Sequence, residues 1–91
     1  MTGAAGYWTI QIAGRERDDI GRRYVCHAWD DGHAQSIAGR LAGSEMGVLG
    51  FDHHRIDNPH GRYARALAIG ESEAVDDADV WSVLKAARRS A

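Results

Sequence analysis

The sequence predicts an α+β domain with the order β-β-α-β-β-α. Three observations support this class: an alternating pattern in 7–12, a helical spacing of apolar residues after Asp30, and a second helical pattern before the C-terminus. We expect a four-stranded antiparallel sheet made of two hairpins, with both helices packed on one face. At 91 residues the chain fits one small domain over 1–91, with 1–5 and 90–91 frayed.

The N-terminal third predicts the first hairpin. Trp8, Ile10 and Ile12 share one face of an extended segment, which is the pattern of a half-buried strand. Residues 14–21 are charged and polar, and we expect them to form the connecting loop. The segment 23–29 is rich in aromatic and β-branched residues, which favour a second strand.

The first helix is expected to begin at Asp30 and Asp31, because an aspartate side chain can cap the free N–H groups of a first turn. Gly43 indicates its end, where glycine commonly follows the last helical turn. The apolar positions between them are mostly alanine, so this helix must lie close to its neighbour. They are Ala34, Ile37, Ala38, Leu41 and Ala42.

The second half repeats the order of strand, strand and helix. We expect strands over 48–56 and 62–69, joined by a turn at 57–61 that contains proline and glycine. A final helix is predicted over 75–89, because acidic residues near its start and basic residues near its end complement the helix dipole. The acidic residues are Asp76, Asp77 and Asp79, and the basic residues are Lys85, Arg88 and Arg89.

Composition excludes several classes of protein. A hydrophobic fraction of 44% argues against intrinsic disorder. With 11 Lys and Arg against 13 Asp and Glu, the net charge of -2 disfavours a strongly basic nucleic-acid binder. The single cysteine, Cys26, excludes a disulfide scaffold and fits the reducing cytoplasm. No apolar run approaches the roughly 20 residues that cross a membrane, so we expect no membrane partner.

Two of the expected strands lack a polar face. In 23–29 and 62–69, apolar or small residues occupy both alternating sets of positions. A sheet with helices on one side should instead show one polar face. We therefore expect the second face to meet a protein partner or a second copy. The residues assigned to this interface are Tyr24, Trp29, Tyr63, Ala64, Ala66 and Ala68.

The alternative hypothesis is a small metal-binding protein or enzyme that uses the His- and Asp-rich second hairpin. Imidazole and carboxylate groups are ligands for zinc and similar metals. The adjacent residues His53 and His54 point to opposite faces of a strand, so only one of them can easily share a site with His60. The ligands of this alternative are His54, Asp57 and His60.

Other patterns carry less chemistry. Cys26 and His27 are also adjacent on a strand and point apart, so we expect Cys26 to be a small buried residue rather than a nucleophile. A third hypothesis is a nucleic-acid binder that uses arginine-rich loops. Acidic residues in the same loops weaken the attraction to phosphate groups. The arginines are Arg15, Arg17, Arg22, Arg23, Arg55, Arg62 and Arg65.

The sequence therefore favours a small non-enzymatic protein-binding module without a cofactor. We expect it to dock on a host protein or to self-associate in the cytoplasm, as an accessory or inhibitory protein of a bacteriophage or mobile element would. Metal binding or catalysis from the second hairpin is the alternative, and nucleic-acid binding is the third hypothesis.

Overall fold

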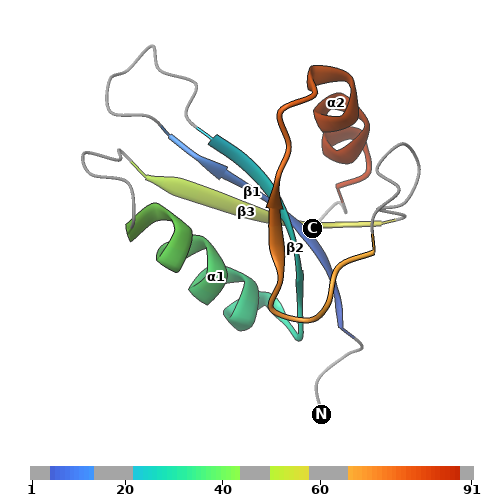
Figure 1. Ribbon diagram of the computed structural model, residues 1–91. Helices are drawn as coiled ribbons and strands as arrows, with labels where there is room; N and C mark the ends of the chain where they lie inside the picture. The colour runs from blue at the N-terminus through green and yellow to red at the C-terminus, as the bar shows by residue number, and fades with distance from the viewer. Residues whose placement is uncertain (1–4, 14–21, 44–49, 58–65, 89–91) are drawn as a thin grey trace.

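The computed structural model describes residues 5–13, 22–43, 50–57 and 66–88. Within them the chain forms four strands and two helices in the predicted order, so the α+β fold class is confirmed. Figure 1 shows the sheet with a helix on either side of it. The elements are β1 (Gly6–Ile12), β2 (Arg22–Ala28), α1 (Asp31–Gly43), β3 (Phe51–Ile56), β4 (Ser72–Ala74) and α2 (Ala78–Ala86).

The four strands are antiparallel and follow the order β3-β1-β2-β4. β1 and β2 pair in the centre, with Trp8 opposite Cys26. Among the described residues the sheet does not contain the predicted second hairpin, because β3 pairs with β1 and β4 pairs with β2, at opposite edges of the sheet. The central position suits β2, whose adjacent residues Val25 and Cys26 are both fully buried.

Successive strand residues point to opposite faces, and each face has its own apolar cluster and its own helix. The prediction that both helices share one face is therefore wrong: α1 covers one face and α2 the other. The α1-side cluster contains Trp8, Ile10, Ile12, Cys26, Ala28, Ala34, Ile37, Ala38 and Ala42. The α2-side cluster contains Val25, Ile56, Leu67, Val75, Trp81 and Leu84. Burial on both sides of the sheet explains why β2 lacks a polar face.

The fourth strand lies later in the chain than 62–69. Residues 66–68 form no strand, and residues 62–65 lie outside the described part. The chain turns at Gly70, whose φ of 88° is the left-handed conformation that glycine adopts readily. This turn is closed by a 2.9 Å hydrogen bond from the Glu71 N–H to the Ala68 carbonyl. β4 begins only after it, where Ser72 pairs with Cys26.

Aspartates cap both helices. Asp30 caps α1, since its Oδ1 accepts the N–H of His33 at 2.8 Å. Asp77 caps α2, where its Oδ1 accepts the N–H groups of Asp79 and Val80 at 2.8 and 3.2 Å. The extended backbone of Asp77 explains why α2 begins after it rather than at residue 75. Neither of the described helices has the length and apolar character needed to cross a membrane.

The cap of α2 predicts a defined loss of stability. Replacing Asp77 by alanine removes the acceptor for two backbone N–H groups, so we expect the free energy of unfolding to fall by about 1 kcal/mol. The neighbouring exposed Asp76 is the matched control, and Asp76→Ala should change stability by less than about 0.5 kcal/mol. Urea titrations followed by circular dichroism measure both values. Equal losses in the two variants would contradict this assignment of the cap.

Candidate functional site

The described residues assigned to an interface from the sequence differ in their exposure and surroundings. Tyr24 is half-buried and packs against the α1-side cluster. Leu67 is buried in the α2-side cluster, and its neighbours Ala66 and Ala68 are exposed. The assignment of these three residues to an interface stays a prediction. The other two predicted residues of this stretch, Tyr63 and Ala64, lie outside the described residues.

Side chains from the two central strands hold the Leu67 backbone. The rings of Tyr7 and His27 stack with centroids 4.5 Å apart and planes 9° from parallel. The Leu67 N–H donates to the Tyr7 hydroxyl at 3.1 Å, and the His27 Nδ1 lies 2.8 Å from the Leu67 carbonyl. A carbonyl only accepts, so this contact requires the proton on Nδ1. Both backbone polar groups of the buried Leu67 are therefore hydrogen-bonded, so Tyr7 and His27 have a structural role here.

The corner between β2 and α1 presents an exposed tryptophan on a fixed backbone. The Trp29 residue is 58% exposed, the largest value among the described large apolar residues. Its N–H donates to the Nδ1 of His33 at 3.0 Å, while the N–H of His33 donates to the Asp30 carboxylate at 2.8 Å. This reciprocal arrangement resembles a capping box, in which two free N–H groups are satisfied together. It fixes the backbone from which the indole projects.

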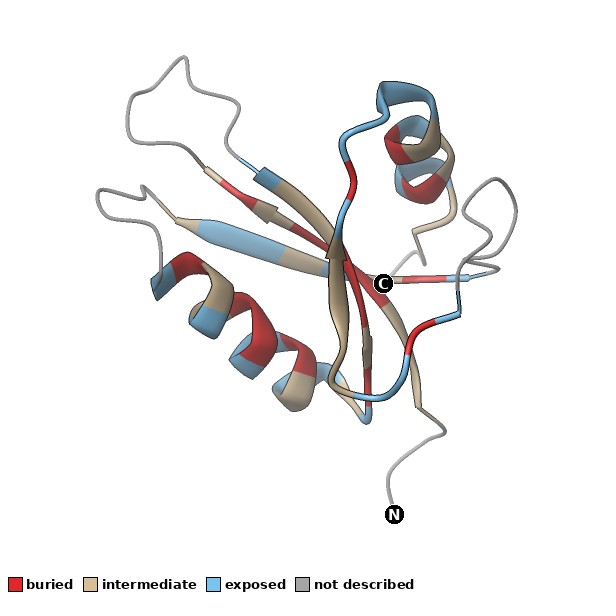
Figure 2. Ribbon diagram, in the orientation of Figure 1, coloured by how far each residue is buried: buried red, intermediate tan, exposed pale blue. Residues whose placement is uncertain are grey.

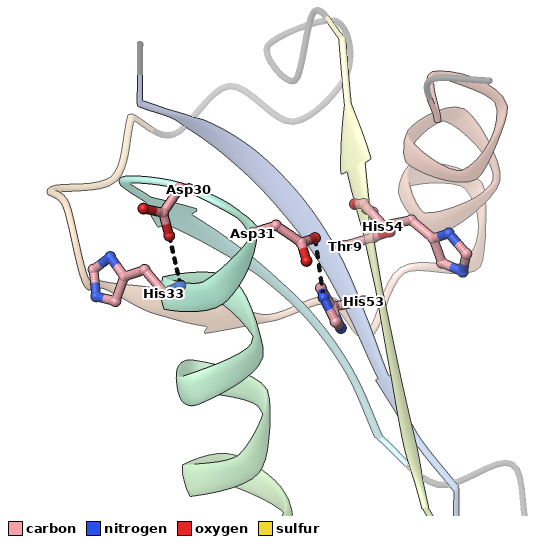
Figure 3. Close-up of polar contacts among 6 residues, drawn as sticks. All are labelled: Thr9, Asp30, Asp31, His33, His53 and His54. Atoms are coloured by element: carbon pink, nitrogen blue, oxygen red, sulfur yellow. Dashed lines mark hydrogen bonds and ion pairs between the residues drawn. The ribbon is translucent and has the colours of Figure 1, made fainter. Parts of the chain in front are cut away.

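A histidine from β3 extends this polar corner (Figure 3). The His53 Nε2 lies 3.1 Å from the Asp31 Oδ1, which joins β3 to the first turn of α1. The Asp31 side chain is 78% exposed, whereas the His53 side chain is 19% exposed. The contact lies at the surface, so it contributes at most about 1 kcal/mol as an ion pair. Its main consequence is geometric, because it ties the start of α1 to β3.

The residues of the metal alternative are not gathered by the described part of the fold. His54 points away from His53 toward the α2 side of the sheet, as Figure 3 shows. Its carbonyl accepts the Thr9 hydroxyl at 3.3 Å, and Asp57 is held by its N–H, which donates to the Ala87 carbonyl at 2.8 Å. No three metal-ligating side chains cluster among the described residues. His60, the third predicted ligand, lies outside them.

Cys26 is buried, as predicted, and it does not face His27. The thiol belongs to the α1-side cluster, whereas the imidazole of His27 stacks on Tyr7 on the other face. Burial raises the pKa of Cys26 from 9.0 to about 12, and a hydrogen bond with the Trp8 backbone only partly opposes this. The reactive form of cysteine is the thiolate, so this thiol is unreactive at neutral pH.

Two of the described arginines cover tryptophans. The guanidinium of Arg23 lies 5.6 Å from the ring centre of Trp81, and that of Arg55 lies 5.2 Å from the ring centre of Trp8. These distances are within the range of a cation–π interaction, so both arginines pack on the two clusters. The other arginines of the third hypothesis are Arg22, which is exposed, and Arg15, Arg17, Arg62 and Arg65, which lie outside the described residues.

Comparisons with protein-family models, with curated proteins and with solved structures found no match for this chain. Two features of the exposed surface were not predicted from the sequence: the contact between Asp31 and His53, and the position of β3 at the edge of the sheet. Both depend on which strand lies beside which, and no short motif carries that information.

Proposed function

We propose that this protein is a non-enzymatic binding module that docks on another protein through the β2–α1 corner. The observation that carries the proposal is the exposed indole of Trp29 on a backbone fixed by Asp30 and His33. Tryptophan is enriched among the residues that contribute most to protein–protein binding. A fixed backbone also lowers the entropy lost on association, since the corner does not need to become ordered on binding.

The surroundings of Trp29 favour a particular kind of partner. Asp30 and Asp31 follow it directly, and the Asp31 side chain is largely exposed. The complementary surface is an apolar pocket for the indole with lysine or arginine side chains on its rim. Opposite charges at such a rim steer the encounter and select the partner more than they add affinity.

Two observations favour binding over catalysis. The only thiol of the chain, Cys26, is buried, and its pKa is raised to about 12, so it is no nucleophile at neutral pH. The two described arginines with aromatic contacts are engaged with the buried rings of Trp8 and Trp81. We also propose that the protein works in the reducing cytoplasm, because Cys26 is a free thiol.

The substitution Trp29→Ala tests this function. The tagged protein is recovered gently from its source cells, and native mass spectrometry of the eluate identifies the bound chain. The affinity of that chain is then measured by calorimetry. We expect Trp29→Ala to weaken it by roughly thirtyfold or more, as the loss of a central tryptophan does at other interfaces. Circular dichroism should remain unchanged, because the side chain is exposed.

The matched control lies on the other helix, α2. Lys85 is an exposed residue of α2, and Lys85→Ala should bind the same partner with unchanged affinity. A partner that binds the Trp29→Ala variant as tightly as the original protein would refute the assignment of this corner. A monomer that carries a metal ion instead of a protein would favour the alternative at the second hairpin.

A further inference from the structure

The turn before β4 presents a second exposed apolar side chain. The Ala68 carbonyl accepts the N–H of Glu71 at 2.9 Å, so Ile69 and Gly70 are the two central residues of this turn. Such positions usually hold glycine, proline, asparagine, aspartate or serine. Ile69 is instead a β-branched apolar residue, and it is 38% exposed. The turn therefore exposes an apolar side chain where a polar one is usual.

Hydrogen bonds fix this turn to itself and to β2. The Oε1 of Glu71 accepts the N–H of Ala68 at 2.9 Å, in addition to the backbone bond that closes the turn. The Gly70 N–H donates to the carbonyl of His27 at 2.7 Å, and the His27 N–H donates to the Glu71 carbonyl at 3.1 Å. The backbone that carries Ile69 is thus ordered before any partner binds, which lowers the entropy lost on association.

The register of the sheet leads from this turn to the end of β2, where Trp29 follows. Cys26 pairs with Ser72, and the hydrogen bonds of His27 extend the contact to the turn. Because antiparallel segments run in opposite directions, three steps beyond this pair lead to Trp29 on one side and to Ile69 on the other. Figure 2 shows an exposed stretch of the chain before β4 close to the exposed end of β2. We call Trp29 and Ile69 the apolar pair.

We propose that Trp29 and Ile69 are two anchors of one docking surface, and that their partner is a folded protein with an apolar cleft lined by basic side chains. This inference rests on the proposed function, and it names the extent of that surface and the shape of its partner. Both anchors lie where the chain bends or turns, so the partner supplies the concave side. An extended peptide has no such cleft. A second apolar anchor beside the indole also excludes water from it, as the residues around a central tryptophan do at other interfaces.

The charges near the apolar pair distinguish among possible partners. Asp30 and Asp31 follow Trp29 directly, and Glu71 lies two residues beyond Ile69. A second copy on the same surface, related by a twofold axis, would bring these carboxylates toward their own equivalents, and like charges across an interface are destabilising. The negative surface of an anionic membrane would repel them for the same reason. Basic side chains around the cleft of a different protein would attract them.

Truncation of Ile69 tests the second anchor. The partner chain that is recovered with the original protein is titrated by calorimetry, as for Trp29→Ala. We expect Ile69→Ala to raise its Kd by roughly tenfold, because the contact loses buried methyl groups. The side chain is partly exposed and its turn is closed by other residues, so the circular dichroism spectrum should not change.

Phe51 is the matched control for this truncation. It has the same 38% exposure as Ile69, but it pairs with Ile12 at the far end of β1 from Gly6, which is the partner of Ala28 beside Trp29. We expect Phe51→Ala to keep the Kd within about twofold of the original value, as residues outside an interface do. Equal losses of affinity in Ile69→Ala and Phe51→Ala would overturn the proposal.

A neutral substitution tests the basic cleft. Glu71→Gln removes the charge and keeps a side-chain oxygen that can accept the Ala68 N–H. We expect the association rate constant to fall by about threefold at low salt, with a smaller difference at high salt, because such charges steer the encounter. Asp76→Asn removes an exposed carboxylate beyond the other end of β4, and it should leave the rate constant unchanged. A faster association of the Glu71→Gln variant would contradict a basic cleft.

Two measurements on the purified chain test the other occupants of the surface. Sedimentation velocity should show a monomer of 9.9 kDa. Flotation with vesicles of phosphatidylcholine and phosphatidylserine should leave the protein unbound. A dimer, or a vesicle complex, that is lost in Ile69→Ala would assign the apolar pair to a second copy or to a membrane, and it would overturn the proposal.

Failure of this inference and failure of the proposed function give different results. If Trp29→Ala weakens partner binding and Ile69→Ala does not, the docking corner stands and the second anchor is refuted. If neither variant weakens binding, both assignments are refuted. Recovery of no bound chain from the source cells would also overturn both.

Discussion

Replacing Trp8 by alanine should cost about 3–5 kcal/mol of folding free energy, a typical value for removing a buried aromatic side chain. Trp8 is 2% exposed and lies at the centre of β1, between β2, β3 and α1. The variant also removes the ring that Arg55 covers at 5.2 Å. Small domains are stable by only about 5–15 kcal/mol, so we expect Trp8→Ala to be partly unfolded at 25 °C. Urea titration followed by far-ultraviolet circular dichroism measures the loss.

Trp29→Ala is the matched control for this experiment. It makes the same chemical change at a residue that is 58% exposed, so stability should change by less than about 0.5 kcal/mol. Arg55→Ala keeps the Trp8 ring and removes only the guanidinium above it, which should cost about 0.5–1 kcal/mol. If Trp8→Ala and Trp29→Ala lost equal stability, the assignment of Trp8 to the core would be wrong.

Local patterns predicted the elements that depend on neighbours in the chain. The alternation of Trp8, Ile10 and Ile12 placed β1 correctly, because period-two burial is a property of one strand alone. The cap at Asp30 and the apolar spacing after it placed α1 to within a residue. The fourth strand was misplaced, since the chain turns at Gly70 and only then reaches β2.

Pairing between distant elements could not be predicted in the same way. Periodicity assigns His53 and His54 to opposite faces, and Figure 3 confirms that they point apart. It does not say that β3 pairs with β1, nor that Asp31 lies beside His53. These contacts depend on the order of strands in the sheet, which is decided by the burial available to the whole chain.

The two apolar faces of β2 illustrate the same limit. The sequence shows correctly that Val25 and Cys26, which point to opposite faces, are both apolar. The inferred cause was a partner on the second face, whereas α2 covers it with Trp81 and Leu84. An apolar stripe indicates that one side of a helix is buried, but it does not indicate which face of the sheet the helix covers. Trp29 was assigned to an interface from its position at a strand end, and this assignment stays a prediction for a residue that is 58% exposed.

Alkaline pH should destabilise the fold through Cys26. Burial raises the pKa of the folded thiol from 9.0 to about 12, whereas the unfolded thiol has its ordinary value. Above about pH 9 the unfolded state therefore releases a proton that the folded state retains. The contribution is fully present below pH 9, and it falls by about 1.4 kcal/mol for each pH unit between 9 and 12. Between pH 9 and 10.5 we expect a loss of about 2 kcal/mol.

Cys26→Ala isolates this contribution from every other group that titrates in the same range. The variant should be less stable at pH 7, because it leaves a small cavity in the α1-side cluster, and its stability should fall less steeply above pH 9. The difference between the two urea midpoints, followed from pH 7 to 10.5, is the measurement. Parallel pH profiles would show that the thiolate is not excluded from the fold. A thiol reagent at pH 8 checks the cause independently, since a buried thiol should react only at the rate at which the sheet and α1 separate.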